Sequence, residues 1–326
     1  MSEKILIIDA MNTFIRNYVA DPTIGLNGEP IGGCRGFLKT LQKLLREINP
    51  EKVIVVWDGG SSSKRRALSK QYKEGRKPLK LNRAYGGMST EEEIKNRYDQ
   101  VAKTINYLNL MPVMQLLVED VEADDIIGYL VSLPSLSEDY KIIVSMDKDF
   151  FQLCDDKTIV YRPVQDRFLT KDRIVEDYGI HPKNFAVARA MDGDKSDNIQ
   201  GVKGVGLKTV AKRLSFLSED RTYTLKEVFE HCSVSGEKIK FFKDVLREKK
   251  KIELNYKLMQ LYNPIFSSNT ALKINESLKS FVPSLNKMKI IKHMYHDGIS
   301  EYDWEPMFKK FKMMLVEHRH YLRHST

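Results

Sequence analysis

Three short runs of almost wholly apolar residues, rich in Ile and Val, constrain the fold of this chain more than any other feature. They cover residues 4–8, 53–57 and 141–144. Runs of this length and composition are typical of central strands in a parallel sheet that is covered on both faces. A helix is predicted over residues 36–48, where the apolar side chains form one stripe. This alternation predicts an α/β fold with a mostly parallel central sheet, flanking helices and right-handed crossovers.

Carboxylates follow these runs at or near the point where each strand would end. Open α/β sheets bind ligands beyond the carboxyl ends of their strands, and several carboxylates in one place raise one another's pKa. Divalent cations are the usual compensation, so convergence of these segments predicts a site for Mg²⁺-type ions. The alternative for any single acid is that it caps the next helix or turn, but four acids at equivalent strand ends favour a shared site. The nine acidic residues are Asp9, Asp58, Glu122, Asp124, Asp125, Asp147, Asp149, Asp194 and Asp197.

A strongly basic stretch follows the second of these acids. Residues 64–83 contain nine Lys or Arg and one acid, Glu74, so this stretch carries +8 in a chain whose formal net charge is +9. Separate acidic and basic elements predict a polyanionic partner, with a solvent-exposed basic helix face as the alternative. We interpret residues 61–97 as an inserted lobe over the sheet edge, in which Ser89 and Glu92 offer a capping box for a helix.

From about residue 170 onward the sequence predicts only helices. Residues 201–209 are rich in glycine, and a tight hairpin here would expose backbone N–H groups between Lys203 and Lys208. Such a hairpin suits a non-specific grip on a phosphate backbone, with an ordinary helix–helix connection as the alternative. The end of the chain is rich in Met, Lys and His, which indicates a solvent-exposed basic helix, with a partner or DNA contact as the alternative.

Length and composition limit the remaining classes. A chain of 326 residues with 42% apolar residues suits a large α/β domain and a smaller helical one, predicted here as 1–170 and 171–326. The three cysteines have no CxxC spacing, which argues for a reducing compartment and against a zinc site. No apolar run approaches the roughly 20 residues needed to span a bilayer, and no signal peptide precedes the first strand. We therefore expect a cytoplasmic protein without a membrane partner.

Several motifs occur in the following order along the chain: Asp9, Trp57-Asp58, Tyr72-Lys73-Glu74-Gly75-Arg76, Val121 to Asp125, Asp147-Lys148-Asp149, Gly193 to Asn198 and Gly201 to Thr209. Together they resemble the 5′-nuclease or flap endonuclease family, especially bacteriophage 5′-3′ exonucleases or RNases H and the 5′-nuclease domain of bacterial DNA polymerase I. The resemblance covers roughly residues 4–265 and departs at Ala10, where many relatives have glycine. It implies a PIN-like α/β nuclease core, an inserted helical arch, and a C-terminal helical domain with a helix-hairpin-helix type motif.

The resemblance also implies roles for the acids. Two Mg²⁺ ions, for which Mn²⁺ can substitute, would be held by two groups of carboxylates, some of them through water. One group would be Asp9, Asp58, Glu122 and Asp124, with Asp147 near the boundary; the other would be Asp149, Asp194 and Asp197, and Asp125 would support the ligands from behind.

Other residues would act on the substrate. Lys73 and Arg76 would reach the scissile phosphate from the base of the arch. Tyr72 would stack on an unpaired base or, alternatively, pack in the core. The hairpin would bind a K⁺ ion and hold the duplex through Lys203, Gly204, Gly206, Lys208 and Thr209.

The predicted function is structure-specific hydrolysis of phosphodiester bonds at 5′ ends and 5′ flaps by two-metal-ion catalysis. The expected partners are DNA with single-strand/duplex junctions or 5′ flaps, RNA–DNA hybrids and replication proteins, and the chain is expected to act as a monomer. One alternative is a related metal-dependent RNase, against which the basic lobe and the hairpin argue. The other is a catalytically silent, structure-specific DNA-binding protein, against which the complete set of acids argues.

Overall fold

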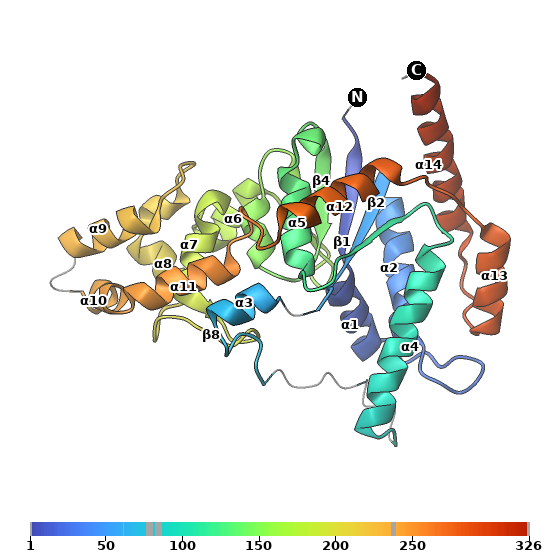
Figure 1. Ribbon diagram of the computed structural model, residues 1–326, viewed down its shortest axis with the longest axis horizontal. Helices are drawn as coiled ribbons and strands as arrows, with labels where there is room; N and C mark the ends of the chain where they lie inside the picture. Colours follow the sequence, from blue (N-terminus) through green and yellow to red (C-terminus); the bar gives the residue numbers. More distant parts are fainter. Residues whose placement is uncertain (1, 61, 76–80, 82–86, 236–238, 325–326) are drawn as a thin grey trace. The chain divides into compact units, whose positions relative to one another are not determined.

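The computed structural model describes residues 2–60, 62–75, 81, 87–235 and 239–324, and the chain forms two compact units (Figure 1). The first unit comprises Met1–Trp57, Pro78–Leu117 and Ser268–Thr326, and the second comprises Asp58–Lys77 and Val118–Ser267. Each unit is therefore built from segments that are far apart in the sequence. The domain boundary predicted near residue 170 lies inside the second unit and stays a prediction. Of the helices in the described residues, none is long and apolar enough to cross a membrane.

Three parallel strands form the sheet segment of the first unit, in the order β3-β2-β1. Every residue of β1 and β2 except the first is buried, as expected for strands that are covered on both faces. The strands predicted at 4–8 and 53–57 are thereby confirmed. The bounds are β1 (Lys4–Asp9), β2 (Lys52–Trp57) and β3 (Met114–Leu117).

The helices of the first unit pack through small residues at one point. Helix α2 (Gly32–Ile48) begins earlier than the predicted residue 36, and a Cβ at Gly33 would lie 2.8 Å from the ring of Phe14 in α1 (Ala10–Ala20). Glycine at this position therefore allows α1 and α2 to approach closely. The predicted capping box is confirmed, because the Ser89 and Glu92 side chains and backbones bond reciprocally at the start of α4 (Thr90–Leu108).

The end of the chain completes this unit. Helix α14 (Glu305–His324) contacts α2, and the amide of Gln42 donates to the carbonyl of Asp303 at 2.9 Å. Lys103 Nζ lies 2.6 Å from Asp297 Oδ1, and the Tyr107 hydroxyl donates to Asp297 Oδ2 at 2.8 Å. The remaining helices of this region are α12 (Ser268–Ser280) and α13 (Lys287–His296).

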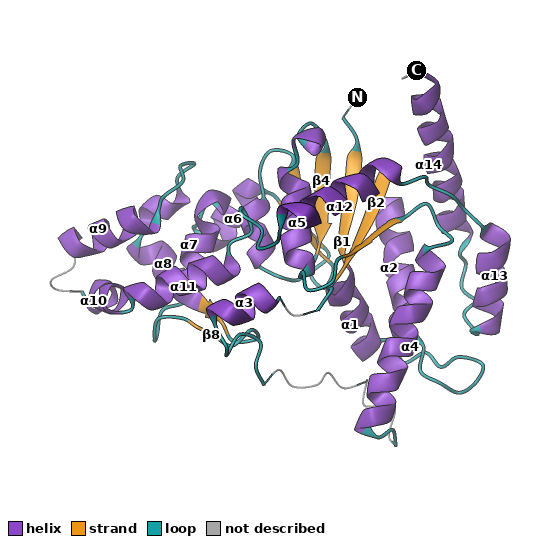
Figure 2. Cartoon of the chain, viewed as in Figure 1, coloured by secondary structure: helices purple, strands orange, loops and turns teal. Residues whose placement is uncertain are grey.

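The second unit contains three strands paired in the order β4-β5-β6. Strands are drawn in orange in Figure 2. Strands β4 (Tyr140–Val144) and β5 (Thr158–Arg162) are parallel, and β6 (Arg167–Leu169) is antiparallel to β5. The third predicted strand is confirmed, and so is the predicted fold class. The helices are α3 (Ser63–Leu68), α5 (Ala123–Ser132), α6 (Lys171–Tyr178), α7 (Pro182–Asp192), α8 (Leu207–Arg213), α9 (Leu225–Ser235), α10 (Lys240–Arg247) and α11 (Lys249–Met259), with short 3₁₀ turns η1 (Pro134–Leu136), η2 (Asp149–Leu153) and η3 (Ser215–Ser218).

The expectation of helices alone after residue 170 is wrong at one place. Between α7 and α8, Gly193–Asp194 (β7) and Ile199–Gln200 (β8) pair as a small antiparallel hairpin. Gly193 has φ +77°, and a Cβ there would lie 2.3 Å from the backbone nitrogen of Gly201. Only glycine fits both conditions, so helix α7 can pass directly into the hairpin.

Candidate active site

The turn after β4 places two half-buried acids close together. The Ser145 hydroxyl accepts a hydrogen bond from the backbone N–H of Asp147 at 3.0 Å, and Asp147 Oδ1 accepts one from that of Asp149 at 2.8 Å. Burial is the largest influence on the pKa of Asp147 and raises it, and the charges of Asp194 and Asp197 act in the same direction. Burial and then the charge of Asp147 raise the pKa of Asp149 to about 7. Burial and the neighbouring acids therefore both disfavour the charged forms of these carboxylates.

Arg189, on α7, holds one group of acids together. Its Nε donates to Asp149 Oδ1 and its Nη2 to Asp194 Oδ2, both at 2.6 Å. Its Nη1 donates to Asp192 Oδ2 at 3.0 Å and to the carbonyl of Gly193 at 2.8 Å. Sequence reasoning missed this residue. The signal that could have found it is a single charge inside the apolar segment 185–191, which indicates a buried arginine that needs carboxylate partners.

The β7–β8 hairpin fixes the position of Asp194. Its Oδ1 accepts hydrogen bonds from the backbone N–H and the hydroxyl of Ser196, at 2.7 and 2.6 Å, and from the backbone N–H of Asp197 at 3.3 Å. Burial alone would raise the pKa of Asp194, but the bonds from Ser196 and Arg189 lower it further than burial raises it. The Asp-Lys-Ser-Asp segment thus forms a local turn that presents both of its acids toward the same site.

Glu122 is the centre of a second group of acids. It is buried and accepts hydrogen bonds from the Tyr72 hydroxyl at 2.8 Å and from Lys73 Nζ at 2.9 Å. Asp197 belongs to this group as well, because its Oδ2 lies 3.4 Å from the Tyr72 hydroxyl and 3.9 Å from Lys73 Nζ. Burial would raise the pKa of Glu122, but Lys73 and Arg65 lower it by more.

Lys73 is held in this position by its backbone. Its N–H donates to the carbonyl of Asp197 at 2.9 Å, and its φ of +57° lies in the left-handed region, which costs a non-glycine residue roughly 1–2 kcal/mol. Burial lowers the pKa of Lys73, but the charges of Glu122, Asp124 and Asp197 raise it by more. The ammonium therefore stays charged beside the acids that the sequence assigned to metal ions.

Arg65 is the second functional cation that sequence reasoning missed. It was counted in the basic stretch 64–83, but its side chain is only 2% exposed and donates to both oxygens of Asp125 and to Glu122 Oε2. Its Nε donates to the carbonyl of Leu258 at 2.9 Å. As a correction, this residue lies in the core and contributes no charge to a basic surface. Asp125 is correspondingly engaged in a buried ion pair, which fits the supporting role expected for it.

The remaining predicted acids lie at strand and helix ends. Asp58 Oδ1 accepts from the backbone N–H of Ala123 at 2.9 Å, which joins Asp58 to the start of α5. Asp124 lies in the first turn of α5, where its charge acts on Lys73. Asp9, in the first unit, accepts from the backbone N–H of Asn12 at 3.2 Å and caps α1, so the capping alternative describes one of its contacts.

The structure thus brings the predicted acids of the second unit into two neighbouring groups that meet at Asp197. Each group already contains an internal cation, Lys73 in one and Arg189 in the other. Over the described residues, no three His, Cys, Asp or Glu side chains are arranged so that they could hold a metal ion as they stand. Arg76, with the rest of 76–80 and 82–86 in the predicted lobe, lies outside the described residues.

Tyr72 is in the core of the second unit. It is 5% exposed and packs against Ile199, Leu258 and Met259. Its hydroxyl serves Glu122, so in this structure the residue has the packing role that the sequence left open beside base stacking.

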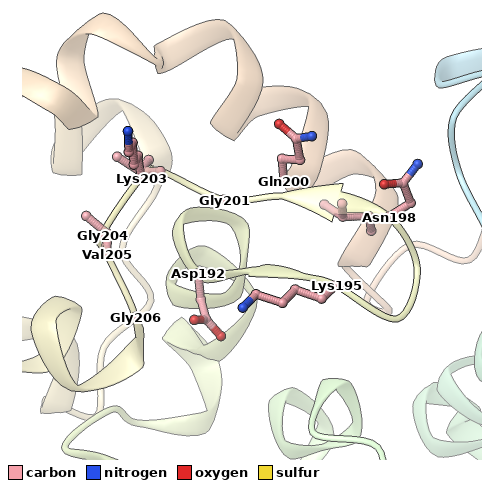
Figure 3. Close-up of a pocket in the computed structure, with 11 residues that line it drawn as sticks. Asp192, Lys195, Asn198, Gln200, Gly201, Lys203, Gly204, Val205 and Gly206 are labelled. Atoms are coloured by element: carbon pink, nitrogen blue, oxygen red, sulfur yellow. The ribbon is translucent and has the colours of Figure 1, made fainter.

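The predicted glycine-rich hairpin lines an open cavity of about 620 Å³ formed by residues 192–206 (Figure 3). Gly204 has φ +76°, Gly206 caps α8, and the backbone N–H of Thr209 donates to the Gly206 carbonyl at 2.8 Å. Lys203 and Lys208 are exposed. The segment therefore forms a tight connection with exposed lysines on either side of it.

Comparisons with known proteins agree with this fold and show the family of the chain. Residues 4–179 match the family model described as 5′-3′ exonuclease, N-terminal resolvase-like domain. A 5′-3′ exonuclease of Aquifex aeolicus is 30% identical over 294 residues, which cover 88% of this chain and 90% of that protein. Flap endonuclease Xni of Shewanella halifaxensis is 30% identical over 282 residues, which cover 85% of this chain and 98% of that protein.

A solved structure shares the fold. The bacteriophage T5 flap endonuclease, determined as a pseudo-enzyme-product complex with DNA and metal ions, superposes with a TM-score of 0.63 at 19% identity, covering 92% of this chain and 100% of that one. The architecture is that of a nuclease. The chain belongs to the 5′-3′ exonuclease family.

Proposed function

We propose that this chain is a structure-specific 5′ nuclease that hydrolyses DNA at 5′ ends and 5′ flaps with the help of two divalent ions, Mg²⁺ or Mn²⁺. RNA primers in RNA–DNA hybrids are the second substrate class that we propose. In this proposal the chain acts in replication, as a monomer that works with replication proteins. The observation that carries the proposal is the pair of neighbouring acidic groups in the second unit, each next to an internal cation. The names of two relatives of this chain, 5′-3′ exonuclease and flap endonuclease, support the proposal.

The donor set fits divalent ions of this kind. All of the candidate ligands are carboxylates, the oxygen ligands that Mg²⁺ prefers, and they outnumber the cations among them. Burial, and then the charges of neighbouring acids, raise the pKa values of Asp147 and Asp149, so a bound cation would stabilise their charged forms, which supports the proposal. We assign Asp9, Asp58, Glu122 and Asp124 to one ion and Asp149, Asp194 and Asp197 to the other, with Asp147 near both. Bound divalent ions activate water and stabilise the leaving oxygen in such reactions.

The chain's own cations then act on the phosphate. Lys73 must release Glu122 to reach a phosphodiester, and its side chain is 16% exposed, so it is only partly buried. A lysine in this role places a compact charge against the phosphate as negative charge develops. Arg76 would grip phosphate oxygens beside it. Tyr72 keeps Glu122 oriented through its hydroxyl.

The hairpin would position the duplex. Exposed lysines at 203 and 208 and the backbone of Gly204, Gly206 and Thr209 suit contact with phosphates, which fixes register without reading bases. The family resemblance implies a K⁺ site in the hairpin, and we assign this site to the backbone carbonyls of the same segment.

Cleavage of a 5′-flapped DNA duplex, with and without Mg²⁺, tests the proposal. We expect products cut at the junction and at the 5′ end in Mg²⁺ and none in chelator, with an RNA-primed duplex also cut. Binding of the flapped duplex without cleavage in either Mg²⁺ or Mn²⁺ would instead identify a catalytically silent DNA-binding protein.

A further inference from the structure

Arg189 occupies an unusual position for a charged residue. It is 5% exposed and lies on α7 between apolar neighbours, yet four hydrogen bonds fix its guanidinium. A buried guanidinium is tolerated only where its donors are satisfied by carboxylates or carbonyls. Here Asp149, Asp192, Asp194 and the carbonyl of Gly193 satisfy them.

The two shortest bonds go to acids from different elements. Asp149 begins η2 after β4, and Asp194 lies in the β7–β8 hairpin, and each carboxylate is 2.6 Å from the guanidinium. Short, charge-assisted contacts of this kind are among the stronger hydrogen bonds in proteins. Arg189 therefore stands between two acids that we assign to the same divalent ion, and it supplies the kind of charge that such an ion would supply.

The other group of acids has a different cation. Lys73 reaches Glu122 through one contact of 2.9 Å on a flexible four-carbon stem, and its second contact, with Asp197, is 3.9 Å long. A lysine held in this way can leave, whereas the guanidinium of Arg189 is held from three sides. Lys73 is therefore held less firmly than Arg189, although the Glu122 group also contains the buried Arg65.

We propose that Arg189 is a positioning residue that serves as a fixed internal counter-ion for Asp149 and Asp194. It keeps this pair assembled when no divalent ion is bound, and its charge weakens the affinity of the pair for such an ion. This inference rests on the proposed function, because it assigns Asp149 and Asp194 to a divalent ion.

Two substitutions separate the charge of Arg189 from its hydrogen bonds. Arg189→Gln removes the charge but keeps an amide that can donate to a carboxylate, and Arg189→Lys keeps the charge. Arg173→Met is the matched control, since Arg173 is an exposed arginine of the same unit that pairs with Glu176 at 2.7 Å. The readouts are Mn²⁺ binding to the DNA-free protein, measured by electron paramagnetic resonance of free Mn²⁺, and Tm in chelator and in Mg²⁺.

For Arg189→Gln we expect Mn²⁺ affinity to rise by about tenfold or more, because a unit charge a few ångströms from an ion repels it strongly at the dielectric of a protein site. Its Tm should fall in chelator and recover in Mg²⁺ by more than that of the wild type. Arg189→Lys should stay close to wild-type Mn²⁺ affinity, and Arg173→Met should match the wild type in both readouts.

Three results would overturn the inference. These are equal Mn²⁺ affinity in Arg189→Gln and Arg189→Lys, weaker Mn²⁺ binding in Arg189→Gln than in the wild type, and an Arg189→Gln protein that stays unfolded even in millimolar Mg²⁺. If that variant is unfolded in chelator and Mg²⁺ restores its circular dichroism, the inference is supported. Wild-type protein that neither binds Mn²⁺ nor cleaves a flapped duplex would instead refute the proposed function itself.

Discussion

Replacing Arg65 by methionine tests whether part of the basic stretch belongs to the core. Arg65 is 2% exposed, and its partner Asp125 is 1% exposed. Methionine fills a similar volume but leaves the Asp125 carboxylate buried without its guanidinium, and it removes the donor to the carbonyl of Leu258. The substitution should therefore destabilise the second unit.

The size of the effect follows from this geometry. Removing one partner of a buried ion pair costs about 3–5 kcal/mol, because the remaining charge is uncompensated. For a folding unit of this size, a loss of that magnitude lowers Tm on the order of 10 °C. Arg66→Met, at the exposed neighbouring position, should change the free energy of unfolding by less than about 0.5 kcal/mol.

Urea denaturation followed by circular dichroism, together with Tm by calorimetry, measures both variants. Adding Asp125→Asn to Arg65→Met should recover part of the loss, because the asparagine carries no charge to leave unpaired. A loss below about 1 kcal/mol for Arg65→Met, or a loss equal to that of Arg66→Met, would show that the pair is solvated and that the reasoning is wrong.

Three further outcomes are expected. Lys73→Ala should lower the single-turnover rate of flap cleavage far more than it weakens duplex binding. Lys70→Ala, at an exposed position of the same stretch, should change that rate little. Lost affinity with unchanged cleavage in Lys73→Ala would assign Lys73 to positioning alone. Asp147→Ala and Asp194→Ala should each retain duplex binding in a gel-shift assay and lose cleavage by orders of magnitude, and normal turnover in both would refute the metal assignment. Burial would raise the pKa of Asp297, but hydrogen bonds from Lys103 and Tyr107 lower it by more. Its stabilising effect is therefore present above the unfolded-state pKa of about 3.9 and is lost as the pH falls through the folded-state value. Asp297→Asn should therefore lower Tm near pH 6 and match the wild type in strongly acidic buffer; a Tm difference that persists there would contradict the linkage.

Much of the fold could be predicted from the sequence because its signals are local. The strand over residues 4–8 is a continuous apolar run, and the helix start at Ser89 carries its own capping partner. The early start of α2 could not be predicted, since Gly32 and Gly33 disfavour a helix by propensity and are placed there by packing against α1. Local propensity and tertiary contact disagree at that point, and the contact prevails.

In the candidate site, too, local sequence signals predict some charged residues and not others. The acids could be predicted because they follow apolar runs, whereas no local pattern marks the cations that neutralise them. Arg65 pairs with an acid 60 positions away, and Arg189 pairs with one 40 positions away. Nothing within a basic stretch shows which arginine is buried, and Tyr72 could equally have been placed on a base or in the core.

The composition of the first unit has a consequence for how the protein is made. Its central strands lie among the first 57 residues, whereas α14, which contacts α2, and Asp297, which bonds to Lys103 and Tyr107 of α4, come after residue 268. Synthesis must therefore pass residue 268 before these late contacts can form, although α1 and α4 can pack against α2 earlier. Nascent or truncated chains that end before residue 268 should thus expose the apolar surface that α14 covers, and their binding to chaperones should fall once that segment has been made.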